Sequence, residues 1–83
     1  MRPTPDIIGR HLGDSAVLIQ MRTGRIYELN ETGARIWALL EAGASRDEVV
    51  AAIAAEFAVE HSDAVDAVDR LIDALRAEGL LLP

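Results

Sequence analysis

Four aspartates recur near the C-terminal end of the chain, and grouped carboxylates can bind metal ions or transfer protons. They are Asp63, Asp66, Asp69 and Asp73. On a helix the last three would fall on the polar side, close to Arg70 and Arg76. An ion pair between Asp66 and Arg70, four positions apart, explains the pattern as an exposed helix face. Asp69 and Arg76 lie instead at one border of the apolar side, where a bound partner would meet them.

The residue types needed for other common chemistries are absent or scattered. The chain has no cysteine, which excludes disulfides, a thiol nucleophile and every thiolate metal site. His11 and His61 lie far apart in sequence, and isolated histidines are surface residues more often than metal ligands. Neither a glycine-rich phosphate loop nor a Ser/His/Asp set is present. We predict that the chain has no catalytic residues and is not an enzyme, and that it holds no metal ion or cofactor.

Two further features also have structural explanations. The run Asp14-Ser15-Ala16 resembles the Asp-Ser-Leu site that carries phosphopantetheine in acyl carrier proteins. In that family the serine opens a helix near the middle of the chain, whereas Ser15 precedes a strand-like run near the N-terminus, so we interpret it as a turn residue. Trp37 is one of only three aromatic residues and is expected in the core rather than in a binding site.

Composition indicates one acidic domain over residues 1–83. Hydrophobic residues make up 51% of the chain and the net charge is −6. Residues 1–30 hold four arginines against three acids, whereas residues 31–83 hold four arginines against eleven. Such an acidic second part repels phosphate backbones. No apolar run approaches the roughly 20 residues that span a bilayer, and no signal peptide is apparent. We expect a cytoplasmic protein that binds neither nucleic acid nor membranes.

Three short strands are predicted in the first part of the chain. They cover residues 6–12, 15–21 and 25–29, and turns at Gly13-Asp14 and Thr23-Gly24 separate them. Short turns imply an antiparallel meander whose middle strand is the second in sequence, so the third strand is an edge. Because residues 16–19 are apolar on both faces, periodicity leaves open which face of the third strand meets the core. Residues 1–5 contain two prolines and are expected to form a loose arm.

Helical spacing begins at Asn30, a good N-cap, and three helices follow. The first ends at Gly43, and the second opens with a capping box formed by Ser45 and Glu48. Ser62 or Asp63 is expected to cap the third, which runs to about residue 78. The residues expected on the apolar sides are Ala34, Ile36, Trp37 and Leu40, then Val49, Val50, Ile53 and Phe57, and finally Val65, Val68, Leu71, Ile72 and Leu75. We predict an α+β, winged-helix-like fold in which a three-stranded antiparallel β-meander precedes three α-helices. The tail of residues 80–82 should pack onto the core.

The run GRIYELNETGARIWALLEAG at residues 24–43 and the ending EGLL at residues 78–81 carry a family resemblance. Together with the capped second helix they resemble the PqqD family, named after a protein of pyrroloquinoline quinone biosynthesis. The resemblance covers residues 12–81. Its signals are Tyr27, Leu29 and Asn30 at the strand-to-helix junction, the Ile36-Trp37 pair and the closing EGLL.

The resemblance implies a stand-alone recognition element for ribosomally made, post-translationally modified peptides. Such proteins bind the leader segment of a precursor peptide and present its core to modifying enzymes. In that family the leader lies as an added strand along the third strand, in a groove closed by the third helix. The implied peptide-binding residues are Arg25, Ile26, Tyr27, Glu28 and Leu29 on one wall, and Val68, Asp69, Leu71, Ile72, Leu75 and Arg76 on the other.

Within that family, the short chain without a fused enzyme is most similar to the leader-binding partner in lasso-peptide synthesis. Such a protein would work with a separate cysteine protease or another modifying enzyme. A role in quinone-cofactor synthesis ranks second.

Two alternatives from other classes remain. A winged-helix DNA-binding protein would share the architecture, but its third helix would carry basic or amide side chains, and this one carries four aspartates against two arginines. A structural subunit of a larger enzyme would bind that enzyme and have no affinity for a leader.

Overall fold

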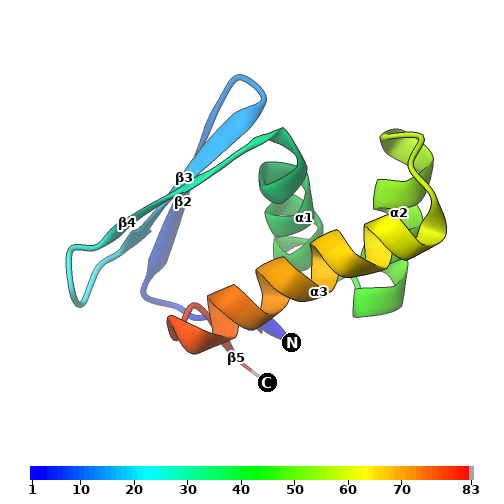
Figure 1. Cartoon of the computed structure of the whole chain (residues 1–83). Helices are drawn as coiled ribbons and strands as arrows, with labels where there is room; N and C mark the ends of the chain where they lie inside the picture. Colours follow the sequence, from blue (N-terminus) through cyan, green and yellow to red (C-terminus); the bar gives the residue numbers. More distant parts are fainter. Residues whose placement is uncertain (83) are drawn as a thin grey trace.

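A three-stranded antiparallel sheet precedes three helices in the chain. The fold is seen in a computed structural model, which describes residues 1–82. The sheet consists of β2 (Ile7–Leu12), β3 (Ser15–Gln20) and β4 (Ile26–Leu29), in the order β2-β3-β4. The helices are α1 (Glu31–Glu41), α2 (Arg46–Glu56) and α3 (His61–Ala77), and they lie on one side of the sheet (Figure 1). The predicted α+β fold is confirmed, and β4 is an edge strand as expected.

The N-terminal arm is held in place, so the prediction of a loose arm was wrong. Strand β1 (Arg2–Pro3) pairs antiparallel with β5 (Leu81–Leu82), and the Thr4 amide donates to the Leu80 carbonyl at 3.1 Å. Leu80 and Leu81 are buried, so this tail packs onto the core as predicted and presents its backbone to the arm. A two-residue edge strand tolerates proline because few of its N–H groups are needed. Both ends of the chain therefore lie together (Figure 1).

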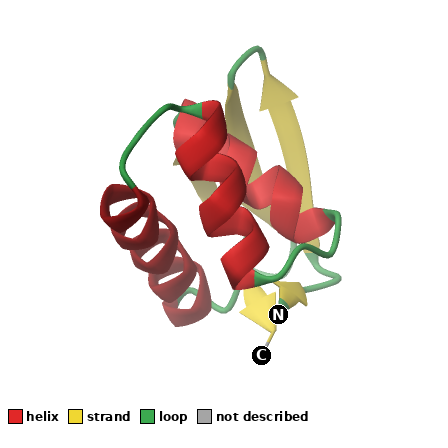
Figure 2. Cartoon of the chain, turned by 90° about the vertical axis from the view of Figure 1, so that its right-hand side faces the viewer, coloured by secondary structure: helices red, strands yellow, loops and turns green. Residues whose placement is uncertain are grey.

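One face of the sheet meets the helices, as the turned view shows (Figure 2). Ala16 and Leu18 on β3 are buried, and their cross-strand partners are Leu29 and Tyr27. Directly opposed residues share a face, so Tyr27 and Leu29 point toward the helices and Ile26 points away. Leu29 is 9% exposed, whereas Ile26 is 64% exposed. The question that periodicity left open is thereby answered.

Helix α1 begins where the sequence predicts. The Asn30 side-chain oxygen accepts a hydrogen bond from the Gly33 amide at 2.9 Å, and the buried apolar side includes Trp37, which is 1% exposed. Gly9 on β2 makes room for that indole, since a Cβ at Gly9 would lie 3.0 Å from Trp37 Nε1. The contact fixes how closely α1 approaches the sheet.

The predicted capping box of α2 is present. The Ser45 amide donates to Glu48 Oε1 at 2.8 Å, and the Glu48 amide donates to Ser45 Oγ at 3.2 Å. The bond from the Ser45 amide lowers the pKa of Glu48. Val49, Val50 and Ile53 are buried as expected. The predicted fourth member, Phe57, lies just past the helix and is half-buried.

Helix α3 begins earlier than predicted and without a side-chain cap. Glu60, in an extended conformation, occupies the N-cap position instead of Ser62 or Asp63, two residues after the chain turns at Ala58 (φ +52°). An early start places Ala64 in the core, where it is fully buried. Gly79, at φ +72°, follows the helix as predicted. The Leu80 amide then bonds to the Leu75 carbonyl at 2.8 Å and directs the tail back to the core.

The predicted ion pair between Asp66 and Arg70 is absent from the part of the chain that the structure describes. Both side chains are exposed, so the prediction from spacing alone was wrong. An exposed pair gains too little to order two flexible side chains.

Candidate peptide-binding groove

The outer edge of β4 has backbone groups without a strand partner. The Gln20 amide donates to the Arg25 carbonyl at 2.9 Å. Hydrogen-bonded pairs alternate along an antiparallel ladder, so Tyr27 and Leu29 bond to their partners on β3. The N–H and C=O groups of Ile26 and Glu28 consequently point away from the sheet.

The second ladder supports the same assignment. The Met21 amide donates to the Asp6 carbonyl at 2.9 Å, and Ile8 pairs with Ile19 in that register. Alternation directs the backbone groups of Ile19 toward β2. Successive residues of a strand point their backbone groups to opposite sides, so Gln20 must face β4, as observed. The free edge of β4 is thus fixed by two independent hydrogen bonds.

A hollow of about 480 Å³ lies between β4 and α3, and we call it the groove. Its lining residues are Glu28, Leu29, Asn30, Thr32, Gly33, Ile36, Ala67, Arg70, Leu71 and Ala74. The members from α3 are three or four positions apart and form one stripe of the helix. Leu29, Ile36 and Leu71 make the groove apolar, and the short side chains of Ala67 and Ala74 leave its helix wall open.

The residues predicted on the strand wall all lie on or next to β4. Glu28 and Leu29 line the groove. Ile26 lies at the free edge, with its side chain on the face away from the helices. Arg25 and Tyr27 lie where β4 begins and contact Glu78. Contact of these residues with a leader stays a prediction.

The residues predicted on the helix wall are spread over four surroundings. Leu71 lines the groove. Val68, Ile72 and Leu75 are 4% exposed or less and pack in the core. Asp69 accepts two bonds from Arg46, with Nε to Oδ1 at 2.8 Å and Nη2 to Oδ2 at 2.7 Å, which lower the pKa of Asp69.

Arg76 lies near the N-terminus rather than beside the groove lining. Its Nη2 is 3.7 Å from Met1 Sδ. The lining residues of α3 that the sequence analysis missed are Ala67, Arg70 and Ala74. Their stripe lies next to the strongly apolar one on the helix, and two alanines give it little signal in a hydrophobicity pattern.

Glu78 accepts two side-chain hydrogen bonds at the beginning of β4, beside a separate hollow of about 370 Å³. Tyr27 Oη donates to Glu78 Oε2 at 3.0 Å, and Arg25 Nη1 donates to the same oxygen at 3.2 Å. These bonds connect the beginning of β4 to the residue after α3. Arg25 and Tyr27 are therefore already engaged with Glu78, outside the groove lining.

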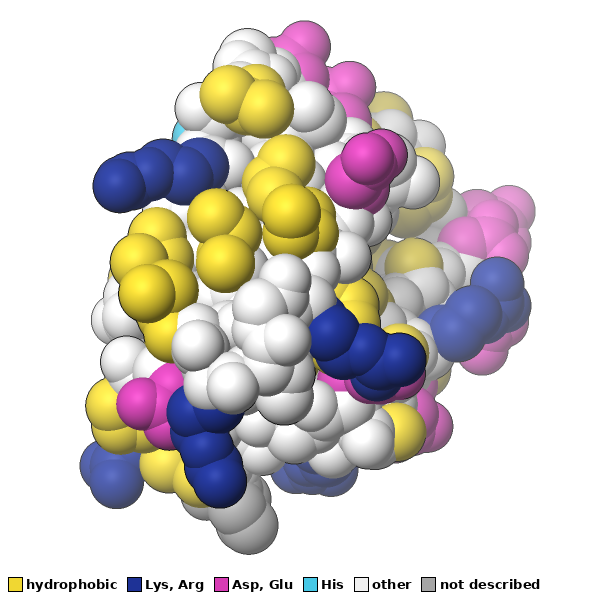
Figure 3. Space-filling view, turned by 90° about the vertical axis from the view of Figure 1, so that its left-hand side faces the viewer, with side chains coloured by type: hydrophobic (Ala, Val, Ile, Leu, Met, Phe, Trp, Pro, Cys, Tyr) yellow, Lys and Arg dark blue, Asp and Glu magenta, His cyan; other side chains and the backbone are white. Residues whose placement is uncertain are grey.

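The face of the sheet away from the helices carries exposed apolar side chains. Figure 3 views this side of the molecule and shows apolar side chains gathered over the strands, with arginines around them. Leu12, Met21 and Ile26 are 62%, 58% and 64% exposed. Ile26 belongs to the free edge, so a strand added there would cover part of it.

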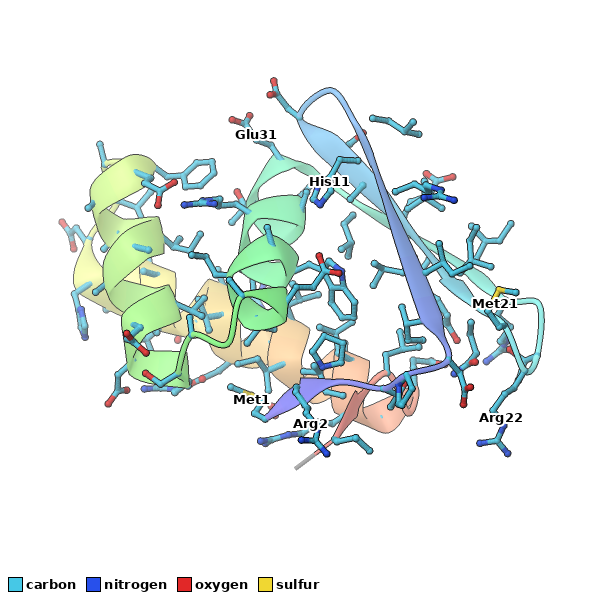
Figure 4. All side chains as sticks on the ribbon, turned by 180° about the vertical axis from the view of Figure 1, so that it is seen from behind. Met1, Arg2, His11, Met21, Arg22 and Glu31 are labelled. Atoms are coloured by element: carbon cyan, nitrogen blue, oxygen red, sulfur yellow. The ribbon has the colours of Figure 1, made fainter. Side chains whose placement is uncertain are left out.

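Another hollow, of about 370 Å³, borders the other end of the sheet, and we call it the β2 hollow. His11 and Glu31 both line it, and the view from behind shows them near the top of the sheet and of α1 (Figure 4). Arg35, also in the lining, binds both carboxylate oxygens of Glu56, at 2.7 and 3.1 Å. This pairing lowers the pKa of Glu56 and raises that of Arg35.

Neither a metal cluster nor a membrane helix is found within residues 1–82. No three His, Cys, Asp or Glu side chains in this range are placed to hold one ion. No helix there is long and apolar enough to cross a bilayer.

Comparison with known proteins agrees with the fold. The sequence profile described as Coenzyme PQQ synthesis protein D (PqqD) matches residues 15–81. The chain belongs to the PqqD family. A comparison with curated protein sequences finds no match for this PqqD family member.

Two solved structures are similar over almost their full length. One is described as TbiB1 in complex with the TbiA(beta) leader peptide. It is 33% identical, with a TM-score of 0.92, and the match covers 98% of this chain and 94% of that one. The other is described as lasso peptide synthetase B1 complexed with the leader peptide. It is 32% identical, with a TM-score of 0.88 and coverage of 99% and 96%. Both are PqqD-like in fold, and each was solved with a leader peptide.

Proposed function

We propose that this chain binds the leader segment of a ribosomally synthesised precursor peptide and delivers it to modifying enzymes. The leader adds as a strand to the free edge of β4 and lies in the groove against α3. The observation that carries this proposal is the juxtaposition of unpaired backbone groups at Ile26 and Glu28 with an apolar hollow lined by Leu71. The likeness to two proteins solved with leader peptides supports it.

The strand edge and the groove contribute different parts of the binding. Main-chain hydrogen bonds contribute about 0.5–1.5 kcal/mol each and are largely independent of sequence. Side chains of the leader that point toward α3 enter the groove against Leu29, Ile36 and Leu71, where burial of apolar area contributes selectivity.

The chain acts without catalysis of its own in this proposal. A separate cysteine protease or another modifying enzyme performs the chemistry on the presented peptide. The pathway favoured is lasso-peptide synthesis, because the full-length likeness extends to a lasso peptide synthetase B1. A chaperone role in quinone-cofactor synthesis is the second candidate, and the family description supports it. Turnover of a precursor by purified chain alone would contradict the non-catalytic role.

The test first identifies a precursor reading frame next to the gene of this chain and uses its leader segment, labelled with fluorescein, as the leader probe. We expect saturable binding in an anisotropy titration. We also expect the amides of Ile26 and Glu28 to gain protection from hydrogen exchange, while those of Tyr27 and Leu29 are protected already. Binding without new protection at Ile26 and Glu28 would place the leader elsewhere, and absence of binding would overturn the proposal.

A gel shift at low salt separates this proposal from DNA binding. We expect no shift of duplex DNA, because the exposed acids of α3 repel phosphates. A salt-sensitive shift together with no affinity for the leader probe would favour the winged-helix alternative.

A further inference from the structure

Arg70 is the one basic residue in the groove lining, and within residues 1–82 it forms no ion pair. Acidic partners are near in sequence, since Asp66 lies four positions before it and Asp73 three positions after. Two other helix arginines are fully engaged: Arg35 binds both oxygens of Glu56, and Arg46 binds both oxygens of Asp69. Arg70 thus keeps its donors available beside the groove.

The surroundings of Arg70 suit a carboxylate from a bound peptide. Its neighbours in the lining are apolar or small, among them Ala67, Leu71 and Ala74. A peptide in the groove would exclude water on that side and strengthen an ion pair relative to one in open solvent. The planar guanidinium offers paired N–H donors that match the two oxygens of a carboxylate.

Resting on the proposed function, we infer that the groove selects leader segments with an acidic side chain that binds Arg70. The leader is a strand, so side chains on one face recur at every second position. The acid must share its face with the apolar side chain that packs against Leu71. The recognised pattern is therefore an Asp or Glu at an even spacing, two or four positions, from an apolar residue.

Glu28, at the strand edge of the groove, points its side chain to the face of the sheet away from the helices, as Ile26 does, and so meets the other face of an added strand. It is the other exposed charged side chain of the groove lining that has no ion partner within residues 1–82. A leader acid beside Glu28 would be repelled, whereas one beside Arg70 is attracted. Main-chain bonds alone are similar for neighbouring registers of an added strand. Arg70 on the helix side and Glu28 on the outer side therefore favour registers in which the leader's acid lies on its face toward α3.

The experiment selects binders from a displayed library of random linear peptides, with no assumption about the natural precursor. Three proteins are used in parallel: the parent chain, Arg70→Glu and Arg10→Glu. Arg10→Glu is the matched control, because Arg10 is exposed on β2, outside the groove, and the charge change is identical. Circular dichroism checks that each protein is folded.

The parent and Arg10→Glu should enrich peptides with an acid at an even spacing from an apolar residue. Arg70→Glu should enrich a basic residue at that position and bind parent-selected peptides about fivefold or more weakly, an effect that decreases as salt rises. Arg70→Gln, which is neutral, should lose the preference without reversing it, and it serves if Arg70→Glu does not fold.

Two results would overturn the inference, and they differ in what they imply. If the parent enriches peptides that protect Ile26 and Glu28 from exchange but show no acidic position, or if both Arg70 variants keep the parental preference, the groove binds leaders without reading charge. If the parent enriches no peptide at all, the proposed function fails together with the inference.

Discussion

Two hollows border helix α1, and they differ in whether the arginine in their lining is already paired. In the β2 hollow, Arg35 and Glu56 bind each other through both carboxylate oxygens. In the groove, Arg70 has no ion partner in residues 1–82. The volumes are comparable, about 370 and 480 Å³, so size does not distinguish a binding site here.

The two edge strands of the sheet differ in the side chains that lie beside them. Both β2 and β4 are edges of the sheet, and both leave alternate N–H and C=O groups unpaired. Of these two hollows, only the one beside β4 has an arginine without an ion partner in residues 1–82. A site for an extended acidic peptide needs an unpaired strand edge together with a free cationic donor, and of these two hollows the groove combines them.

The largest expected effects come from proline at the two edges. Tyr27→Pro should unfold the sheet or destabilise it by more than about 2 kcal/mol, because it removes a bond to β3. Ile26→Pro should preserve the fold and lower the affinity for the leader probe about tenfold, because the N–H of Ile26 faces the leader. His11→Pro, at an outward-facing position of β2, should leave affinity unchanged. Circular dichroism measures whether each variant is folded, and anisotropy titration measures its affinity for the leader probe. An equal loss of affinity for Ile26→Pro and His11→Pro would show that the leader does not bind preferentially at the edge of β4.

Ile72→Ala tests which stripe of α3 belongs to the core. Ile72 is 4% exposed, so its truncation should cost about 2–5 kcal/mol in the free energy of unfolding. Urea denaturation provides the measurement. A folded variant of parental stability that loses leader affinity would instead assign Ile72 to the groove wall.

Leu71→Ala and Phe57→Ala compare the two hollows directly. Each side chain is half-buried and lines one of them. Loss of the apolar side chain at Leu71 should lower the affinity for the leader probe about fivefold to tenfold. Phe57→Ala should leave this affinity unchanged. If only Phe57→Ala lowers the affinity, the leader binds in the β2 hollow and not in the groove.

Asn30→Ala separates stability from binding within the groove lining. The lost cap bond to the Gly33 amide should lower the free energy of unfolding by about 1 kcal/mol. Leader affinity should change little, because the Asn30 side chain is already engaged with the helix. Unchanged thermal unfolding would show that the cap bond contributes nothing to stability.

The smallest effect expected concerns acid pH and the paired hollow. Glu56 has a pKa below its ordinary value because of Arg35. Its contribution to stability is therefore complete above the ordinary pKa of a glutamate and is lost as pH falls through the lowered value. Arg35→Gln should flatten the acid limb of the stability profile slightly, and Arg70→Gln should not, because Arg70 has no carboxylate partner in residues 1–82. Equal profiles for both variants would mean that the Arg35 pair adds no stability.

Local signals in the sequence determined most of the fold. Asn30, Ser45 with Glu48, and Gly79 act on backbone groups within a few residues of themselves, so the boundaries they set were predictable. The turns at Gly13 and Gly24 likewise fixed a meander with β4 at its edge. These effects depend on nearest neighbours in the chain and not on how the elements pack.

Packing between distant segments determined the features that were predicted wrongly or not at all. The arm formed β1 because the buried tail lay beside it, and α3 began at His61 without a side-chain cap. The helix wall of the groove consists of Ala67, Arg70, Leu71 and Ala74. Periodicity identifies the most apolar stripe of a helix, and that stripe packs in the core. Which neighbouring stripe then faces β4 depends on the rotation of α3 over the sheet, and only tertiary contacts set that rotation.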